Sequence, residues 1–366
     1  MESAKPERLL SLDALRGFDM FWIIGGDSII HALKEYTGWS WLISISNELT
    51  HVDWNGFQFY DLVFPLFLFL SGVAMPYSIT RQLESGVPKK DIYTKVFLRA
   101  LTLFIMGIVY NGLGDWKFQN IRFASVLGQI GIAYFFAAVI FLNTNWKQQI
   151  YWIIGILLGY WGLQAIVPLL YGGGPFTMEG SINAFFDQRF MPGKLYLEIH
   201  DPEGWLVKIS ATATALIGAL TGAFIKNGNY SKGKKTSYLF AAGILLLILS
   251  FLWNFILPVN KNLWTSSFVI KTAGWSIVLL SAFYFIIDAK GYKKWAFFFV
   301  IIGMNPITIY LASNIIDFGY TVNFIFAGLI SFFTAGLQPV VFGIILVLLK
   351  WVILWFMYKR KIFLKV

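Results

Sequence analysis

The sequence has 366 residues, of which 57% are hydrophobic, 19% aromatic and only 13% charged, and it contains no cysteine. An ordinary soluble protein carries about 25% charged residues, so this composition excludes that class, while the absence of cysteine excludes disulfides and thiolate chemistry. The net charge of +10 raises nucleic-acid binding as an alternative, but we expect no nucleic acid because membrane topology accounts for the basic residues.

Apolar stretches of about 20 residues, each long enough for a membrane-spanning helix, recur along the chain. They do not alternate polar and apolar residues as barrel strands do, so the sequence predicts an all-α polytopic membrane protein. Ten spans are predicted, at 12–33, 60–80, 93–113, 122–143, 149–171, 206–226, 237–258, 265–288, 295–317 and 337–357. The apolar stretch 320–335 is shorter, and it could be an eleventh span, a re-entrant segment or an interfacial segment.

The orientation follows from the basic residues. The first apolar run lacks the small-residue cleavage site of a signal peptide, so we expect it to remain as the first span. With ten spans, most of the 29 Lys and Arg residues fall in connections on one side, which the positive-inside rule assigns to the cytoplasm. We therefore expect a cell inner-membrane protein with both termini cytoplasmic, and with the connections 34–59 and 172–205 outside.

The first span carries polar groups that are costly within a membrane. Arg16 lies three residues from both Asp13 and Asp19, which favours local ion pairs near the cytoplasmic boundary and leaves a functional role open. Asp27 and His31 are four residues apart and share a helix face, just after two consecutive glycines that allow the helix to unwind.

The next connection, NELTHVDWNGFQFYDLVFP (47–65), places a histidine and two aspartates between apolar runs. His51 could be an ordinary interfacial histidine, or a base that titrates near neutral pH at the mouth of a cavity. Trp54 suits an interfacial aromatic belt, and Asp61 suits a cap at the start of the second span.

Two polar features precede later spans. Arg122 begins the fourth predicted span, where it could serve only as an anchor. In DPEGW (201–205), Asp201 can cap the sixth span with Pro202 as its first helical residue.

Two further polar stretches interrupt the apolar pattern. PVNKNLW (258–264) is an external turn that can bind a polar ligand, although turns favour these residues anyway. In GMNPI (303–307), the Asn305-Pro306 pair predicts a kink within the ninth span. The sequence shows no Walker loop, dinucleotide fingerprint or metal cluster, so we expect no metal.

Together these stretches resemble the heparan-α-glucosaminide N-acetyltransferase family, which includes a lysosomal membrane enzyme and bacterial relatives. The similar blocks, in the family's order, are RLLSLDALRG (8–17), THVDWNGFQFYDLVFPLFLFLSG (50–72), DPEG (201–204), PVNKNLWTSSF (258–268), GMNPI (303–307) and YKRKIF (358–363). They cover nearly the whole chain. The lysosomal enzyme has an added luminal domain and an extra leading span, and this chain looks like the bacterial core without them.

The resemblance implies a single transmembrane acyltransferase domain over residues 1–366. Such a protein takes acetyl from cytoplasmic acetyl-CoA and places it on the amino group of glucosamine, or of a terminal glucosaminide as in heparan sulfate, on the external side. The family's proposed catalytic histidine, just before Trp-Asn-Gly, falls on His51. A second proposed catalytic position, an asparagine in the family enzyme, falls on Asp27, and this departure leaves the role of that position open.

From the motifs and the resemblance we expect two sets of binding residues. The expected substrate-binding residues are Trp54, Asn55, Asp61, Arg122, Glu203, Asn262 and Trp264, and the expected CoA-binding residues are Arg16 and Asn305. Asn55 is also a candidate donor to the tetrahedral oxyanion. The expected partners are acetyl-CoA, an amino-sugar acceptor and the lipid bilayer, and a homodimer is left open.

Two other functions stay open. A secondary transporter of a polar solute also uses polar residues in broken spans, although no clear inverted repeat relates the two halves of this chain. An O-acyltransferase that modifies a surface glycan has a similar topology. Within the N-acetyltransferase reading, His51 could act as a general base or as a covalent acetyl carrier.

The predicted topology can be tested with reporter fusions in whole cells. We expect reporters within 47–56 and 180–200 to lie outside, because the positive-inside rule leaves the flanking connections cytoplasmic. Reporters within 84–90, within 230–235 and at the C-terminus should lie inside. A C-terminal reporter found outside would contradict the ten-span arrangement and make 320–335 a full span.

Overall fold

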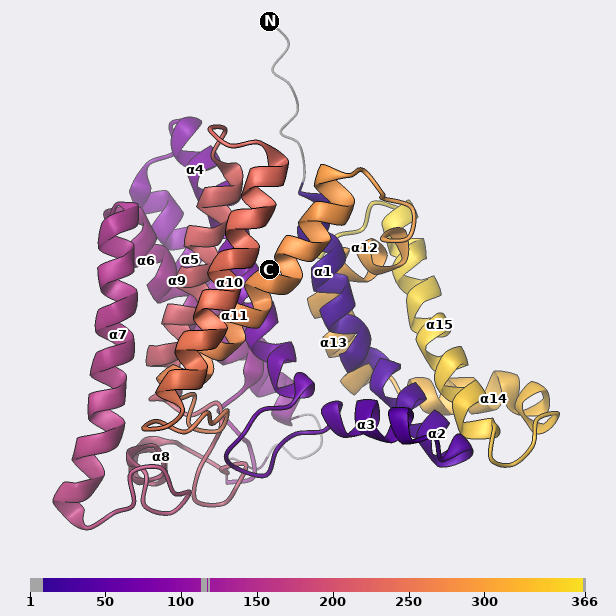
Figure 1. The fold of residues 1–366 in the computed structure, drawn as a ribbon. Coiled ribbons are helices and arrows are strands. Elements are labelled where there is room, and N and C mark those ends of the chain that lie inside the picture. Colours follow the sequence, from indigo (N-terminus) through magenta and orange to yellow (C-terminus); the bar gives the residue numbers. More distant parts are fainter. Residues whose placement is uncertain (1–8, 113–116, 118, 365–366) are drawn as a thin grey trace, which may run out of the picture.

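The computed structural model describes residues 9–112, 117 and 119–364, and this part of the chain is helical without a β-strand (Figure 1). The α-helices are α1 (Leu10–Phe21), α2 (Asp27–Thr37), α3 (Ser40–Glu48), α4 (Val63–Glu84), α5 (Lys89–Gly112), α6 (Val126–Asn143), α7 (Trp146–Ile166), α8 (Ile182–Phe190), α9 (Val207–Lys226), α10 (Lys232–Trp253), α11 (Ser266–Phe283), α12 (Phe297–Met304), α13 (Pro306–Ile315), α14 (Phe318–Ser331) and α15 (Gln338–Lys359). Short 3-10 segments (Phe59–Leu62, Val167–Tyr171) and π segments (Trp22–Gly26, Tyr284–Ala289) join or extend them. The predicted all-α class is confirmed.

Among the residues described, eight helices are long and apolar enough to cross a membrane, and the bent pair α12 and α13 makes a ninth. The first predicted span is divided into α1 and α2 by the π segment Trp22–Gly26, in which Gly25 has a φ of 129° that favours glycine. These elements agree with a polytopic membrane protein of about ten spans.

The stretch 320–335 forms most of α14, which has 14 residues. At about 1.5 Å per residue such a helix is about 21 Å long, which is shorter than the hydrocarbon core of about 30 Å. Figure 1 shows α14 lying across one end of α15. Its length and direction favour the re-entrant or interfacial alternative over an eleventh span.

The predicted start of the fourth span and the predicted cap of the sixth span are wrong. The fourth span begins at Val126, because the hydroxyl of Ser125 accepts a hydrogen bond from Gly128 N at 3.0 Å and caps α6 there, which leaves Arg122 in the preceding loop. The sixth span begins at Val207. Asp201 does not cap it, because its carboxylate accepts two charge-assisted hydrogen bonds from Arg122, which are stronger than a cap bond.

The predicted kink at Asn305-Pro306 is confirmed. The axes of α12 and α13 meet at 71° across it, and Pro306 begins α13 at a position where a helix needs no N–H donor. Both halves of the bent pair, α12 and α13, pack against α1.

Helices α4 and α9 pack with their backbones in contact. A Cβ atom at Gly72 of α4 would lie 2.0 Å from Ala215 O, and one at Gly218 of α9 would lie 2.2 Å from Phe69 O. Small residues are the usual means of close helix approach in a membrane. Figure 1 shows α4–α7 and α9–α11 on one side of α1, and α14 and α15 on the other.

The break between α1 and α2 has a buried partner. The ammonium of Lys350, on α15, donates a hydrogen bond of 2.9 Å to Ile24 O, next to Gly25. A backbone carbonyl released by a helix break within a membrane must find such a partner. Helices α2, α3 and α8 lie together at one end of the bundle (Figure 1), and this is the end that the sequence predicts to be external.

Candidate active site

A cavity of about 440 Å³ opens among the loops at the predicted external end. Its polar lining comes from His51, Asp53, Tyr60, Arg122, Tyr196, Glu203, Lys261 and Asn262, and its apolar lining includes Ile23, Phe64, Val126 and Tyr310. A cavity of about 540 Å³ lies beside the opposite end of α4, but its lining contains no histidine or carboxylate. The first cavity is therefore the candidate active site, because its lining contains groups that can transfer protons.

His51 is held by a buried carboxylate. Its Nδ1 lies 2.7 Å from Oδ1 of Asp61, whose side chain is only 1% exposed, whereas the His51 side chain is 49% exposed. The second oxygen of Asp61 accepts a hydrogen bond from Gln58 N at 3.1 Å, within a capping box at the start of the second span. With Nδ1–H donated to Asp61, Nε2 is the ring nitrogen whose lone pair can accept a proton.

Lys261 completes this group, and the sequence reasoning did not single it out. Its Nζ lies 3.0 Å from Nδ1 and 3.1 Å from Nε2 of His51, and 3.6 Å from Oδ1 of Asp61. Burial lowers the pKa of Lys261, while Asp61 and Glu203 oppose that shift. The signal available in the sequence was its position as the cation of PVNKNLW.

Asp27 reaches His51 through Tyr60. The Tyr60 ring centroid lies 4.9 Å from that of His51, and the Tyr60 hydroxyl donates to Oδ2 of Asp27 at 3.0 Å. Asp27 Oδ1 accepts from the backbone N–H of Ser28 at 2.7 Å. His31, expected on the same face as Asp27, lies with Nδ1 2.6 Å from the Ser46 hydroxyl. The carboxylate in contact with the His51 ring is Asp61.

Arg122 joins two carboxylates at another wall of the cavity. Its Nε and Nη2 donate to the two oxygens of Asp201 at 2.7 and 2.6 Å, Nη2 also donates to Glu203, and the guanidinium lies 4.7 Å from the centroid of the Tyr196 ring. Burial opposes the charge of Arg122, but the two carboxylates outweigh it and raise the pKa above its ordinary value. Burial also raises the pKa of Glu203, with Arg122 opposing the shift.

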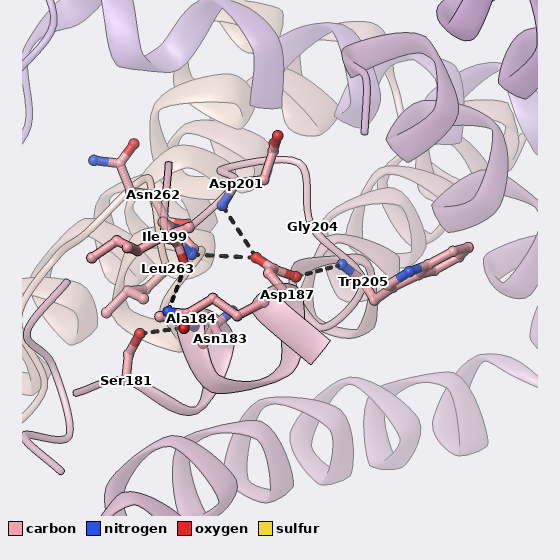
Figure 2. Close-up of polar contacts among 12 residues, drawn as sticks. Ser181, Asn183, Ala184, Asp187, Ile199, Asp201, Gly204, Trp205, Asn262 and Leu263 are labelled. Atoms are coloured by element: carbon pink, nitrogen blue, oxygen red, sulfur yellow. Dashed lines mark hydrogen bonds and ion pairs between the residues drawn. The ribbon is translucent and has the colours of Figure 1, made fainter. Parts of the chain in front are cut away.

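A second buried carboxylate, Asp187 of α8, holds the loops that carry these groups. It accepts hydrogen bonds from the backbone N–H groups of Asp201 and Trp205 at 3.2 and 3.3 Å (Figure 2). Its Oδ2 also lies 3.4 Å from Nδ1 of the fully buried His200, whose Nε2 lies 2.9 Å from Asn262 O. The loop before α9 is thereby tied to the turn that carries Lys261. The sequence reasoning gave neither Asp187 nor His200 a role.

Three expected substrate-binding residues, Arg122, Glu203 and Asn262, line the cavity, and Asp61 lies behind His51. The other three do not line the cavity and instead make contacts within the surrounding loops and helices. Trp54 donates to Phe176 O at 2.8 Å, and Asn55 accepts a hydrogen bond from Asn260 at 3.0 Å. Trp264 is 1% exposed and packs against Phe64, with ring centroids 5.0 Å apart.

The two expected CoA-binding residues lie outside the lining of this cavity. The expected ion pair of Arg16 is present, with Nη1 at 3.6 Å from Oδ1 of Asp13. Asn305 is buried and holds the segment that follows α15, donating to Ile362 O at 3.0 Å and accepting from Leu364 N at 3.1 Å. Their part in binding CoA stays a prediction.

A narrow apolar cavity of about 40 Å³ adjoins the polar one. The two share Ile23, Phe64, Val126 and Tyr310, and the narrow one extends to Pro306 at the α12–α13 break. The polar site therefore has an apolar extension into the bundle. Among the residues that the structure describes, no group of three or more His, Cys, Asp or Glu side chains could hold a metal ion.

The fold and the site define a polytopic all-α membrane protein with a polar cavity built around a His–Asp–Lys group. No known family model matches the sequence. The chain is 26% identical to the heparan-alpha-glucosaminide N-acetyltransferases of Homo sapiens and Mus musculus over 376 and 379 residues, which is 86% of this chain in both comparisons. The resemblance read from the motifs is confirmed as a distant family relationship.

The match covers 54% of the human protein and 56% of the mouse protein. The chain thus spans about half the length of the curated relatives it matches.

Proposed function

We propose that this protein is a transmembrane acetyltransferase. It moves acetyl from acetyl-CoA on the cytoplasmic side to the amino group of glucosamine or a terminal glucosaminide on the external side. The observation that carries the proposal is the His51–Asp61 pair, whose imidazole borders a polar cavity at the predicted external end. The names of the two distant relatives support the same activity.

The acceptor amine must be neutral to attack a thioester. His51 is the base that removes its proton, through Nε2, because Asp61 occupies Nδ1. Asp61 also favours the imidazolium that forms, since its buried carboxylate faces the ring at 2.7 Å. The protonated His51 then returns that proton to the departing thiolate of CoA, and the second proton that the nitrogen loses as the amide forms passes to solvent. In the covalent variant of this route, Nε2 attacks the thioester itself and passes the acetyl group to the amine.

The tetrahedral oxyanion needs a positive or hydrogen-bond-donating group, and Lys261 is placed to supply it. Its Nζ lies 3.1 Å from Nε2, so a carbonyl carbon attacked beside that nitrogen brings its oxygen close to the ammonium. The Lys261 side chain is 16% exposed, so little water competes for the oxyanion. Asn55, the donor expected from the sequence, is hydrogen-bonded to Asn260 and does not line the cavity.

The acetyl thioester must reach His51 from the cytoplasmic side. The apolar extension between Phe64, Tyr310 and Pro306 leads into the bundle from the site, and its apolar walls suit the uncharged arm of CoA. Its volume of about 40 Å³ is too small for that arm, so donor binding requires the α12–α13 break to open. The nucleotide phosphates stay at the cytoplasmic end, near basic connections.

Replacing His51 tests the function. His51→Ala should lower acetyl transfer from labelled acetyl-CoA to glucosamine by about 10²–10⁴, the usual contribution of a general base, while expression and folding stay intact because the side chain is half exposed. His31→Ala is the matched control, because it removes a histidine outside the cavity lining. A folded His51→Ala protein with near wild-type activity would refute the assignment.

The same assay separates the alternative functions. Uptake of glucosamine without acetylation would indicate a transporter, and formation of an acetyl ester on a glycan would indicate an O-acyltransferase.

The two carboxylates near His51 should differ in their effects. Asp61→Asn keeps the shape, but it removes the charge that favours the imidazolium and leaves one amide oxygen for two donors, His51 Nδ1 and Gln58 N. We therefore expect kcat to fall by at least 10²-fold with KM for acetyl-CoA little changed. Asp27→Asn restores the family residue and can still accept from Tyr60, so its effect should be under tenfold, and Asp27→Ala should be more severe. Steady-state kinetics of the three variants measure this, and a larger loss in Asp27→Asn than in Asp61→Asn would make Asp27 the principal partner.

Lys261 should act in the transition state. Lys261→Met should lower kcat by about 10²–10³, as removal of an oxyanion donor does, and leave KM for glucosamine within a few fold. Lys261→Arg should retain part of the activity because the charge remains. Lys271→Met is the control, since Lys271 lies over the Phe57 ring and outside the cavity lining. A raised KM with unchanged kcat in Lys261→Met would instead assign this residue to acceptor binding.

A further inference from the structure

The charged groups around the polar cavity are mostly carboxylates. Asp53 and Glu203 line the cavity together with Arg122 and Lys261. Two more carboxylates lie behind these cations, with Asp201 bonded to Arg122 and Asp61 at 3.6 Å from Lys261.

Each cation of the lining already faces a carboxylate, so neither adds an unmatched positive charge to the cavity. Arg122 donates from Nε and Nη2 to Asp201 and from Nη2 to Glu203, so its charge is matched by two acids. The ammonium of Lys261 lies 3.6 Å from Oδ1 of Asp61, and the proposed reaction uses it for the oxyanion beside His51. A sulfate group is bound in proteins by guanidinium or ammonium groups that can turn their donors to it.

The charged groups farther from the cavity do not remove the excess of carboxylates around it. The buried ammonium of Lys208 donates to the carbonyl oxygens of Glu203 and Gly204 at 2.7 and 2.6 Å, and Asp187 adds a further carboxylate beside His200. Asp53, by contrast, is exposed and borders the cavity. A cation entering the cavity therefore meets an uncompensated carboxylate, while an anion is repelled by it.

We propose that the acceptor is an amino sugar that carries no sulfate on the ring bearing the reacting amine. This rests on the proposed function and narrows its substrate class. The ammonium of such a sugar is attracted before His51 deprotonates it, and a cavity of about 440 Å³ falls within the range of about 300–1,000 Å³ usual for small-ligand sites. A sulfate on the same ring would bring into this cavity a charge of the same sign as Asp53 and Glu203, which line it.

The test compares three acceptors with the purified wild-type protein at one ionic strength: glucosamine, glucosamine 6-sulfate and 6-O-methylglucosamine. We expect kcat/KM to be at least tenfold lower for the sulfate than for glucosamine. The neutral 6-O-methyl sugar should stay within threefold of glucosamine, because it carries a substituent at the same carbon without the charge. Equal or higher kcat/KM for the sulfate overturns the proposal, and so does an equal loss with the 6-O-methyl sugar, which indicates steric exclusion.

Asp53→Lys tests the electrostatic origin. It should reduce the glucosamine to glucosamine 6-sulfate ratio of kcat/KM by at least threefold, whereas Asp91→Asn, at the start of α5 and outside the lining, should leave the ratio unchanged. A ratio that Asp53→Lys does not move overturns the proposal. If no amine is acetylated, the proposed function fails, and the binding affinities of the same three sugars, measured by calorimetry, decide the charge preference separately.

Discussion

The cavity depends on one buried carboxylate at the end of the bundle, Asp187. A carboxylate removed from water is stable only when hydrogen bonds and opposite charges replace its hydration, and here two backbone N–H groups and His200 do so. Because those partners come from the loop before α9, and His200 in turn contacts Asn262 O, one side chain fixes two loops against α8. A loop conformation that breaks these contacts leaves the charge unsatisfied, which favours the present shape of the cavity wall.

Polar groups within the helix bundle must also find partners in place of water. A helix break in a membrane releases carbonyls that water cannot reach, and the break before α2 is tolerated because Lys350 donates to Ile24 O. The break directs α2 toward the loops, where Asp27 accepts from Tyr60 and Tyr60 lies on His51. The helices and the polar group at their end are thus connected through Lys350 of α15, Asp27 of α2 and Tyr60 of the 3-10 segment before α4.

The predictions that succeeded depend on local patterns. Apolar runs of about 20 residues fix the helices, and Asn305-Pro306 fixes a bend, because a span length and a missing N–H are local properties. The predictions that failed depend on distant partners. Asp201 has the residue type of a helix cap, but Arg122, 79 residues away, competes successfully for its carboxylate. The sequence also could not show that Asn55, a candidate oxyanion donor, lies outside the cavity lining, with its amide oxygen accepting from Asn260.

The sequence by itself determined the membrane class, the helical content and the distant relationship, and it drew attention to His51. The tertiary structure decided the partners of that histidine. Asp61 and Lys261 are separated by 200 positions in the chain. In the sequence, Asp61 had the pattern of a helix cap and Lys261 was one residue of a polar turn. The packing of α4 and α11 positions the loops before these helices, and with them the carboxylate and the cation next to the His51 ring. That packing is a property of the folded chain and leaves no pattern in the order of its residues.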